Sequence, residues 1–401
     1  MRGSLFSTQM HFCVISAASA LVVQACAGPR PVPVSSSPTV VIAQTRIVTL
    51  SEITTEGELV ARAERALMEQ RWRNAADAYR TLLAADSESP NAAGYLFDLG
   101  LALEGLQDRT HARDAFLELV RRFPDGPHAR GALVRVATLD AYLEDWPALQ
   151  SIGDRLFART DLDDVERIVA LGARALASVE RGNDVAASRD INDGLDLADQ
   201  LHYGDRDVLP VAVAQVRFAL GELRRVRSER IRFDPMPADF LAQLDARCEG
   251  LLQAQAAYAQ AVRSVDPHWA AMAGYRLGAM YRLLHHDLMQ IPPPSSTRTP
   301  RQREAFFAFM HVRYRVLLEK GLREIDETIA LGERTSDSSA WILRAREAKE
   351  EMQNALAEER ARLQQMPFRE ADVKAALDLL QKKARASGSA PGATPAPHPA
   401  P

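Results

Sequence analysis

The chain has 401 residues and a mass of 44.2 kDa, which is more than one ordinary domain requires. Hydrophobic residues make up 47% and charged residues 25%, a globular composition that excludes a wholly disordered or collagen-like chain. Lys and Arg total 49 and Asp and Glu total 53, giving a formal net charge of −4. This near balance argues against a nucleic-acid-binding protein, which would carry a clustered basic excess. The length fits two domains or one elongated array of repeats.

The N-terminal residues have the features of an export signal. An apolar stretch from Phe12 to Val23 is too short to cross a hydrocarbon core of roughly 30 Å, but it suits a secretory signal peptide. The motif Val23-Gln24-Ala25-Cys26 follows it and resembles the bacterial lipobox. The resemblance implies that residues 1–25 are a lipoprotein signal peptide and that Cys26 is lipidated after cleavage. The alternative is an ordinary signal peptide in which Cys26 is only a small residue after the cleavage site.

Lipidation would determine the location of the protein. Several acyl chains together anchor a protein stably where a single chain does not. Ala27 follows the cysteine, which in lipoproteins favours the outer over the inner membrane. We therefore expect a protein anchored by lipid in the outer membrane and facing the periplasm.

Two terminal segments lack a periodic apolar pattern. Residues 26–52 are rich in proline and serine, which predicts an extended tether that holds the folded body away from the membrane. Residues 386–401 are rich in Ala, Pro, Gly and Ser, which predicts a disordered tail.

Between these segments, apolar residues recur at i, i+3, i+4 and i+7, a pattern typical of helices. The stretch Ala75-Ala-Asp-Ala-Tyr79 is matched 37 residues later by Ala112-Arg-Asp-Ala-Phe116. Leu99-Gly100 precedes the second stretch and Pro124 follows it, and the whole pattern resembles the tetratricopeptide repeat. In that repeat Gly100 and Ala112 would let two helices approach closely and Phe116 would fill the space beside them. Pro124 would end the second helix.

The sequence therefore predicts an all-α, tetratricopeptide-like solenoid of helical hairpins. Repeats are expected over residues 53–205, and the third repeat is placed with Ala148 and Val136 at the positions of Ala112 and Gly100. Residues 206–367 are expected to form a distal helical region with a Pro-rich insertion, followed by a short helix over residues 368–385. Within the distal region the charged stretch from Ser339 to Gln365 is predicted to cap the solenoid with a polar outer face. The alternative is a coiled-coil partner helix.

Two further motifs resemble bacterial envelope proteins. The run Arg121-Arg-Phe-Pro124-Asp-Gly-Pro127-His-Ala129 resembles repeat lipoproteins related to the barrel-assembly lipoprotein and the cell-division coordinator of Gram-negative bacteria. The stretch from Leu251 to Tyr258, the stretch from Trp269 to Tyr281 and the run Ile291-Pro-Pro-Pro294 resemble the distal part of myxobacterial and related deltaproteobacterial repeat lipoproteins. In the second of these stretches Gly278 is expected to be a close-packing position, as Gly100 is.

Stacked hairpins form a curved solenoid whose first helices line a concave groove, and such grooves bind peptides or partner helices. The positions expected to line the groove in the second, third and distal repeats are Phe97, Leu101, Glu104, Leu133, Ala137, Asp140, Tyr275, Ala279 and Arg282. The alternative for each is packing against a neighbouring helix.

Catalytic and metal-binding patterns are weak. In the cluster His285-His286-Asp287 the adjacent histidines point about 100° apart on a helix, so a solvated helix end is predicted rather than a metal site. Cys248 is predicted to be a small buried helix residue rather than a nucleophile. The sequence contains no zinc-protease motif, paired C-x-x-C, nucleophile elbow or phosphate-binding glycine loop. We expect no enzyme activity, no cofactor and no metal.

Binding is therefore the predicted activity. We expect a non-catalytic scaffold that organises an envelope protein complex, with envelope proteins as partners and no nucleic acid or small-molecule substrate. Two alternatives stay open: a regulator of a cell-wall synthase or hydrolase, and an accessory subunit of outer-membrane protein assembly.

Overall fold

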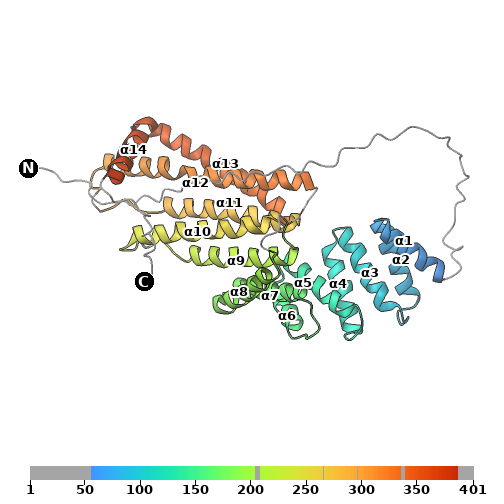
Figure 1. Cartoon of the computed structure of the whole chain (residues 1–401). Helices are drawn as coiled ribbons and strands as arrows, with labels where there is room; N and C mark the ends of the chain where they lie inside the picture. Colours follow the sequence, from blue (N-terminus) through green and yellow to red (C-terminus); the bar gives the residue numbers. More distant parts are fainter. Residues whose placement is uncertain (1–55, 204–207, 265, 296, 336–338, 387–401) are drawn as a thin grey trace, which may run out of the picture.

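The computed structural model describes residues 56–386 except 204–207, 265, 296 and 336–338. Over these residues the chain forms fourteen helices and no strand, as Figure 1 shows. The predicted all-α class is confirmed. The predicted signal peptide, Cys26, the tether and the tail beyond Ala386 lie outside the described residues.

The proximal half consists of four hairpins of short helices, α1 to α8. Their bounds are Glu56–Met68 and Trp72–Ala85, Ala92–Gly105 and Arg109–Arg122, Ala129–Tyr142 and Trp146–Phe157, and Asp164–Glu180 and Asp184–Gln200. The distal half consists of longer helices, α9 to α13, followed by the short α14. Their bounds are Val211–Glu229, Phe240–Val262, Pro267–Met289, Pro300–Thr335, Ala340–Gln365 and Glu370–Ala386.

The turn within each proximal hairpin has a fixed geometry. Gln70, Gln107 and Glu144 follow one another at intervals of 37 residues, and their φ angles are 55°, 60° and 59°. This left-handed conformation closes a helix in the fewest residues but strains any side chain with a Cβ. The fourth hairpin places Gly182 there, with φ of 75°. The first three hairpins are therefore one structural unit repeated every 37 residues.

The 37-residue interval corrects the expected register of the third repeat. Residues 37 positions after Ala112 and Gly100 are Leu149 and Ala137, and both are fully buried. Ala148, which was expected to match Ala112, is only half-buried. The expected spacing of 36 was wrong by one residue, because the larger Leu149 replaces the repeat's small anchor residue.

Capping side chains define where several helices begin. Asp108, Asp145 and Asn183 accept hydrogen bonds from backbone N–H groups at the starts of α4, α6 and α8. Asp163 and Glu166 form a capping box at the start of α7. These polar caps satisfy donors that the first turn of a helix leaves free.

Proline marks the starts of other helices, in two different ways. Asp266 caps α11 directly before Pro267, which is the first helical residue. Pro90 and Pro127 instead lie in turns two residues ahead of α3 and α5, whose helices begin at Ala92 and Ala129.

Small residues set the close approach of helices in both halves. A Cβ added at Gly100 would lie 2.4 Å from the Phe116 ring, so α3 and α4 pack in contact there. Ala112 and Phe116 are fully buried, and Pro124 follows the end of α4. In the distal half, a Cβ at Gly278 would lie 2.5 Å from Ile325 and 3.1 Å from the Gly321 carbonyl oxygen.

Helix α13 covers α11 and α12 at the end of the solenoid. Met352 and Leu356 of α13 pack with Leu318 and Ile325 of α12 in a small apolar core. The outward positions of α13 carry mostly charged and amide side chains. The predicted capping helix is confirmed.

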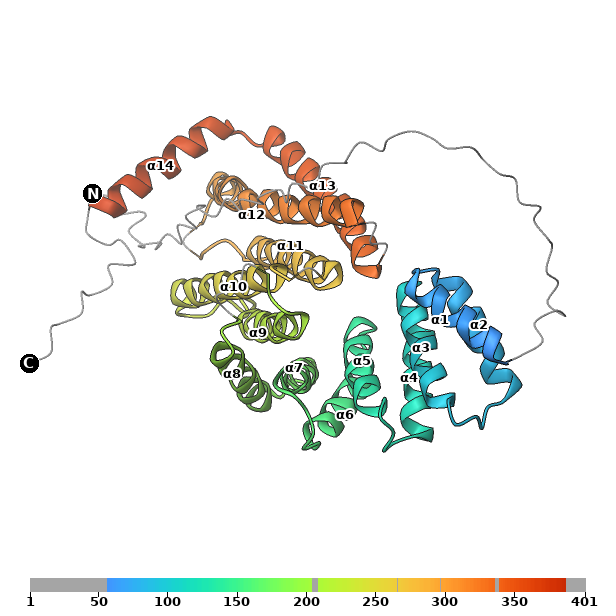
Figure 2. The ribbon, with the colours of Figure 1, turned by 45° about the vertical axis from the view of Figure 1, so that its right-hand side comes forward.

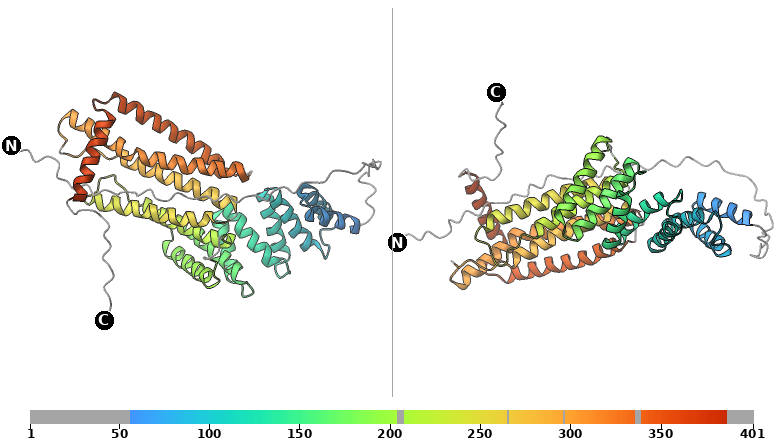
Figure 3. Two further views of the ribbon diagram at one scale, coloured as in Figure 1. Left: turned by 45° about the horizontal axis from the view of Figure 1, so that its top comes forward. Right: turned by 90° about the horizontal axis from the view of Figure 1, so that it is seen from below.

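The two halves meet across a large separation in sequence. Figure 2 shows the hairpins curving into an arc, with α1, α5, α7 and α9 on its inner side and α2, α6, α8 and α10 outside. The Tyr142 hydroxyl at the end of α5 donates to Asp266 before α11, and Glu144 lies 2.7 Å from Arg344 of α13. Figure 3 shows the same relation from two other sides, with the short hairpins extending away from the long distal bundle.

Candidate protein-binding face

The inner side of α3 and α5 carries half-buried apolar side chains beside charged ones. We call this surface the inner face, and its residues are Phe97, Leu101, Glu104, Val134, Arg135 and Tyr142. Gly131 of α5 lacks a side chain where the Phe97 ring lies, because an added Cβ would be 3.4 Å from that ring. Arg135 donates to Glu104 at 2.6 Å and joins the two helices. The inner face is therefore a continuous surface over two repeats.

Aromatic contacts fix the two ends of the inner face. The Phe97 ring lies 5.6 Å from the Phe116 ring in an edge-to-face arrangement and 5.2 Å from His128. At the other end, the Tyr142 ring lies 4.2 Å from the His268 ring and 5.5 Å from the Trp269 ring, so α11 covers this end of the face. The face thus presents rigid apolar side chains with an exposed charged residue, Arg135, along one edge.

Three of the expected groove residues lie on the inner face, whereas those of the third repeat do not. Phe97, Leu101 and Glu104 are half-buried on α3. Leu133, Ala137 and Asp140 are buried, with exposed fractions of 3%, 0% and 1%, so their placement in the groove was wrong.

The register error explains this placement. Counting 37 residues from Phe97 and Leu101 gives Val134 and Thr138, both half-buried, and this count alone would have found them in the sequence.

Asp140 is instead a buried carboxyl group within the repeat. Its nearest cation is Arg113 of α4, at 3.7 Å, and neither carboxyl oxygen has a hydrogen-bond partner among the described residues. Burial raises the pKa of Asp140 to about 7, although Arg113 opposes the shift.

The distal half closes its own inner side with buried charges. Glu222 of α9 is fully buried, lies 2.7 Å from Arg225 and 3.2 Å from Arg276 of α11, and accepts a hydrogen bond from the Tyr258 hydroxyl. Burial alone would raise the pKa of Glu222, but Arg276 and Arg225 lower it to about 2. Burial and then the charge of Glu222 raise the pKa of Glu180 on α7 to about 7. Arg225 and Arg276 each lie within 4.0 Å of both Glu222 and Glu180, so these charges are paired within the chain.

At the expected distal groove, α13 of the same chain packs over Tyr275 and pairs with the partly exposed Arg282. Tyr275 lies 5.4 Å from the Trp341 ring, and Arg282 forms an ion pair with Glu351. Ala279, between them on α11, is half-buried. The groove expected here is therefore occupied by α13, and its placement as an open groove was wrong. The sequence could not show it, because α13 begins at Ala340, 58 residues after Arg282.

The histidine cluster also differs from its prediction. His285 is buried, and its Nε2 lies 2.7 Å from Oε1 of Glu359 on α13. His311 of α12 places Nδ1 3.0 Å from the same oxygen. Burial opposes ionisation of Glu359, but the two imidazoles lower its pKa to about 2.

The prediction of a solvated helix end holds for His286 and is wrong for His285, since the partner carboxylate lies 74 residues away. Cys248 is buried on α10, as predicted, and forms no disulfide with another described residue. Over the residues that the structure describes, no group of three or more His, Cys, Asp or Glu side chains has an arrangement that could hold a metal ion. Within the same residues, no helix is both long and apolar enough to cross a membrane.

Comparison with known proteins finds likeness only among solved structures. No protein-family model and no curated protein sequence matches the chain. A tetratricopeptide repeat protein from Parabacteroides merdae is 11% identical, with a TM-score of 0.38 over 72% of this chain and 98% of its own. A repeat protein from Bacteroides fragilis is 10% identical, with a TM-score of 0.27 over 75% and 99%. The Cut9–Hcn1 hetero-tetramer of APC/C is 15% identical, with a TM-score of 0.29 over 84% and 73%.

Proposed function

We propose that this chain is a lipid-anchored, non-catalytic scaffold whose inner face binds a segment of an envelope protein. The observation that carries the binding role is the half-buried apolar row of Phe97, Leu101 and Val134, which no helix of the distal half covers among the described residues. Apolar side chains held rigidly beside a charged rim are typical of surfaces that take an amphipathic partner helix. The envelope location rests on the lipobox-like motif at Cys26.

The contrast with the distal half supports this choice of face. At the corresponding positions of α11 the chain supplies its own covering helix, and Trp341 packs against Tyr275. A partner would have to displace α13 to bind there. On α3 and α5 it would only have to displace water.

The binding role is tested by a crosslinked pull-down from the cells that make the protein. Leu101→Glu places a charge in the apolar row and is expected to reduce recovery of the partners at least tenfold. Val185→Glu is the matched control, because Val185 is 83% exposed on α8, outside the arc. Equal recovery with both variants would contradict the assignment of the inner face.

The envelope location is tested by a separate variant, Cys26→Ser. The native chain is expected in outer-membrane fractions and the variant in the soluble periplasmic fraction. A variant that stays membrane-bound would contradict the lipid anchor without touching the binding role. Partners whose catalytic rate changes on binding would favour a regulator of a cell-wall enzyme over a scaffold.

A further inference from the structure

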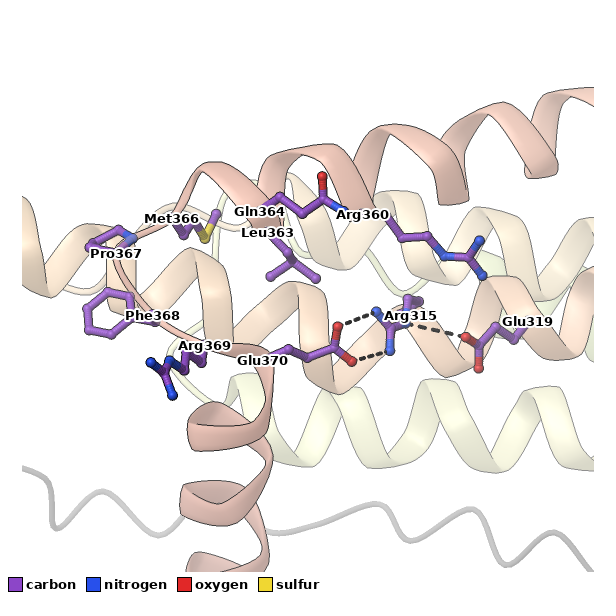
Figure 4. A pocket seen from close by; sticks show the side chains of 10 residues that line it. All are labelled: Arg315, Glu319, Arg360, Leu363, Gln364, Met366, Pro367, Phe368, Arg369 and Glu370. Carbon is purple, nitrogen blue, oxygen red and sulfur yellow. Dashed lines mark hydrogen bonds and ion pairs between the residues drawn. The ribbon is translucent and has the colours of Figure 1, made fainter.

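A pocket lies at the elbow between α13 and α14, against the side of α12 (Figure 4). Its volume is about 700 Å³. Leu363, Met366 and Phe368 supply an apolar wall, and Leu363 points into the pocket. The pocket belongs to the capping end of the molecule, far in sequence from the inner face.

The centre of the pocket is an arginine that already holds a carboxylate. Nη2 and Nη1 of Arg315 lie 2.6 and 3.2 Å from the two oxygens of Glu370, and Nε lies 3.3 Å from Glu319. A two-pronged pair of this kind is among the stronger polar contacts in proteins. Hydrogen bonds from Arg315 and Lys374 lower the pKa of Glu370 to about 2, so the carboxylate is ionised in neutral solution. Glu370 therefore marks where an anionic group binds.

Glu370 is the first residue of α14, and little else holds this helix. Leu377 is buried among Ala308, Val312 and Leu363, while most other described side chains of α14 are exposed. Figure 1 shows α14 crossing the end of the long bundle rather than lying along it. A helix held by one buried side chain, the half-buried Val373 and one interhelical ion pair opens at a lower free energy than the core helices do.

The positive charge around the pocket favours the binding of a carboxylate from another protein. Arg360 and Arg369 also line the pocket, and no ion pair ties either of them to another described residue. If α14 swings away together with Phe368, Arg369 and Glu370, Arg315 and Arg360 are left facing the single carboxylate of Glu319. An incoming carboxylate would restore the balance and recover the two-pronged contact with Arg315.

We propose that this pocket is a second protein-binding site, which α14 occupies until a partner segment replaces it. The partner carries an aromatic residue two positions before a carboxylate at the start of a helix, as Phe368 and Glu370 do here. The partner's aromatic side chain takes the place of Phe368 against Leu363 and Val312, and its carboxylate pairs with Arg315. The site acts independently of the inner face, and its failure would leave the proposed scaffold function in place.

A fluorescent peptide of residues 366–378 with blocked ends is the probe, titrated against the full chain by anisotropy. Leu377→Asp should release α14 and tighten probe binding at least tenfold, because the internal competitor is removed. Adding Arg315→Gln should remove that gain, and a probe with Gln for Glu370 should bind at least tenfold more weakly. Leu379→Asp is the matched control, since Leu379 is 59% exposed on the same helix, and should bind the probe as the native chain does.

Three results would overturn the proposal. The first is unchanged binding in Leu377→Asp, and the second is an equal change in Leu379→Asp. The third is a concentration-dependent dimer that Glu370→Gln abolishes, which would assign the pocket to a second copy of the chain.

Hydrogen exchange on the native chain tests the same point if Leu377→Asp fails to fold. Excess probe should speed exchange over 370–386 and leave α13 unchanged. If the probe binds and exchange over 370–386 does not become faster, the probe does not displace α14, and the proposal is contradicted.

Discussion

The proximal and distal halves both pack helical hairpins into an arc, but they use different side chains to do so. In α3 to α6 the hairpins repeat every 37 residues, pack through small residues and aromatic rings, and leave the inner side of the arc open. In α9 to α13 the helices are longer, and a buried carboxylate, two arginines and a covering helix close that side. The difference separates a surface available to other proteins from a rigid support.

The largest effect is expected at the buried charges of the distal half. Glu222→Gln removes the carboxylate that lies between Arg225 and Arg276, and leaves Arg276 with only Glu180, at 3.9 Å, as its counter-charge. This should cost about 3–4 kcal/mol of unfolding free energy. Chemical denaturation at pH 7 measures it. Glu180→Gln is the control and should cost less than about 1 kcal/mol, because Glu180 with a pKa of about 7 is already protonated in part. Similar losses in both variants would contradict the role given to Glu222.

Gly→Ala substitutions measure how much stability depends on the close helix contacts in each half. Gly278→Ala meets a backbone carbonyl as well as Ile325 and should lose about 3 kcal/mol. Gly100→Ala meets side-chain atoms alone, those of the Phe116 ring, and should lose about 1–2 kcal/mol. Gly57→Ala has open space around it and should gain about 0.5 kcal/mol, as expected for a helix residue. Thermal unfolding of the three variants measures the order. A larger loss at Gly100 would reverse the comparison.

The proximal half should show a pH dependence from Asp140. Its folded pKa of about 7 is above the unfolded value of about 3.9, so the folded state binds more protons between these values. Stability from this group is therefore present below pH 4 and falls as the pH rises towards 7. Asp140→Asn should stabilise the chain by roughly 1–2 kcal/mol more at pH 8 than at pH 5 in urea titrations. The same gain at both pH values would contradict this.

The smallest effect is expected at the rim of the inner face. The pair between Glu104 and Arg135 is partly exposed, so Arg135→Ala should lose less than about 1 kcal/mol. Because exposed pairs are screened, the loss should disappear in 1 M salt. A loss above about 2 kcal/mol would mean that the rim holds α3 and α5 together rather than serving a partner.

The packing of helices within one hairpin could be predicted from the sequence, whereas the covering of α11 by the distant helix α13 could not. Gly100, Phe116 and Pro124 lie within 25 residues of one another, and their order is enough to predict a hairpin. The third repeat was misplaced by one residue because Leu149 took the place of an alanine, and no local pattern marked the change. One residue of shift on a helix is about 100°, which moves a side chain from an exposed to a buried side.

The distal site depended on residues that sequence spacing does not connect. Tyr275 and Arg282 match the groove positions of a repeat, and only the folded chain shows α13 lying over them. His285 likewise finds Glu359 on that helix. Polar partners on different helices are joined by the three-dimensional path of the chain, so their pairing requires the structure.

Site-specific photocrosslinking tests the central contrast most directly. A benzophenone side chain is placed at Leu101 on the inner face in one chain and at Ala279 on α11 in another, and both are irradiated in the cells that make the protein. The account predicts crosslinks to other proteins from position 101, and from position 279 only crosslinks within the chain. Partner proteins captured from 279 and none from 101 would contradict it.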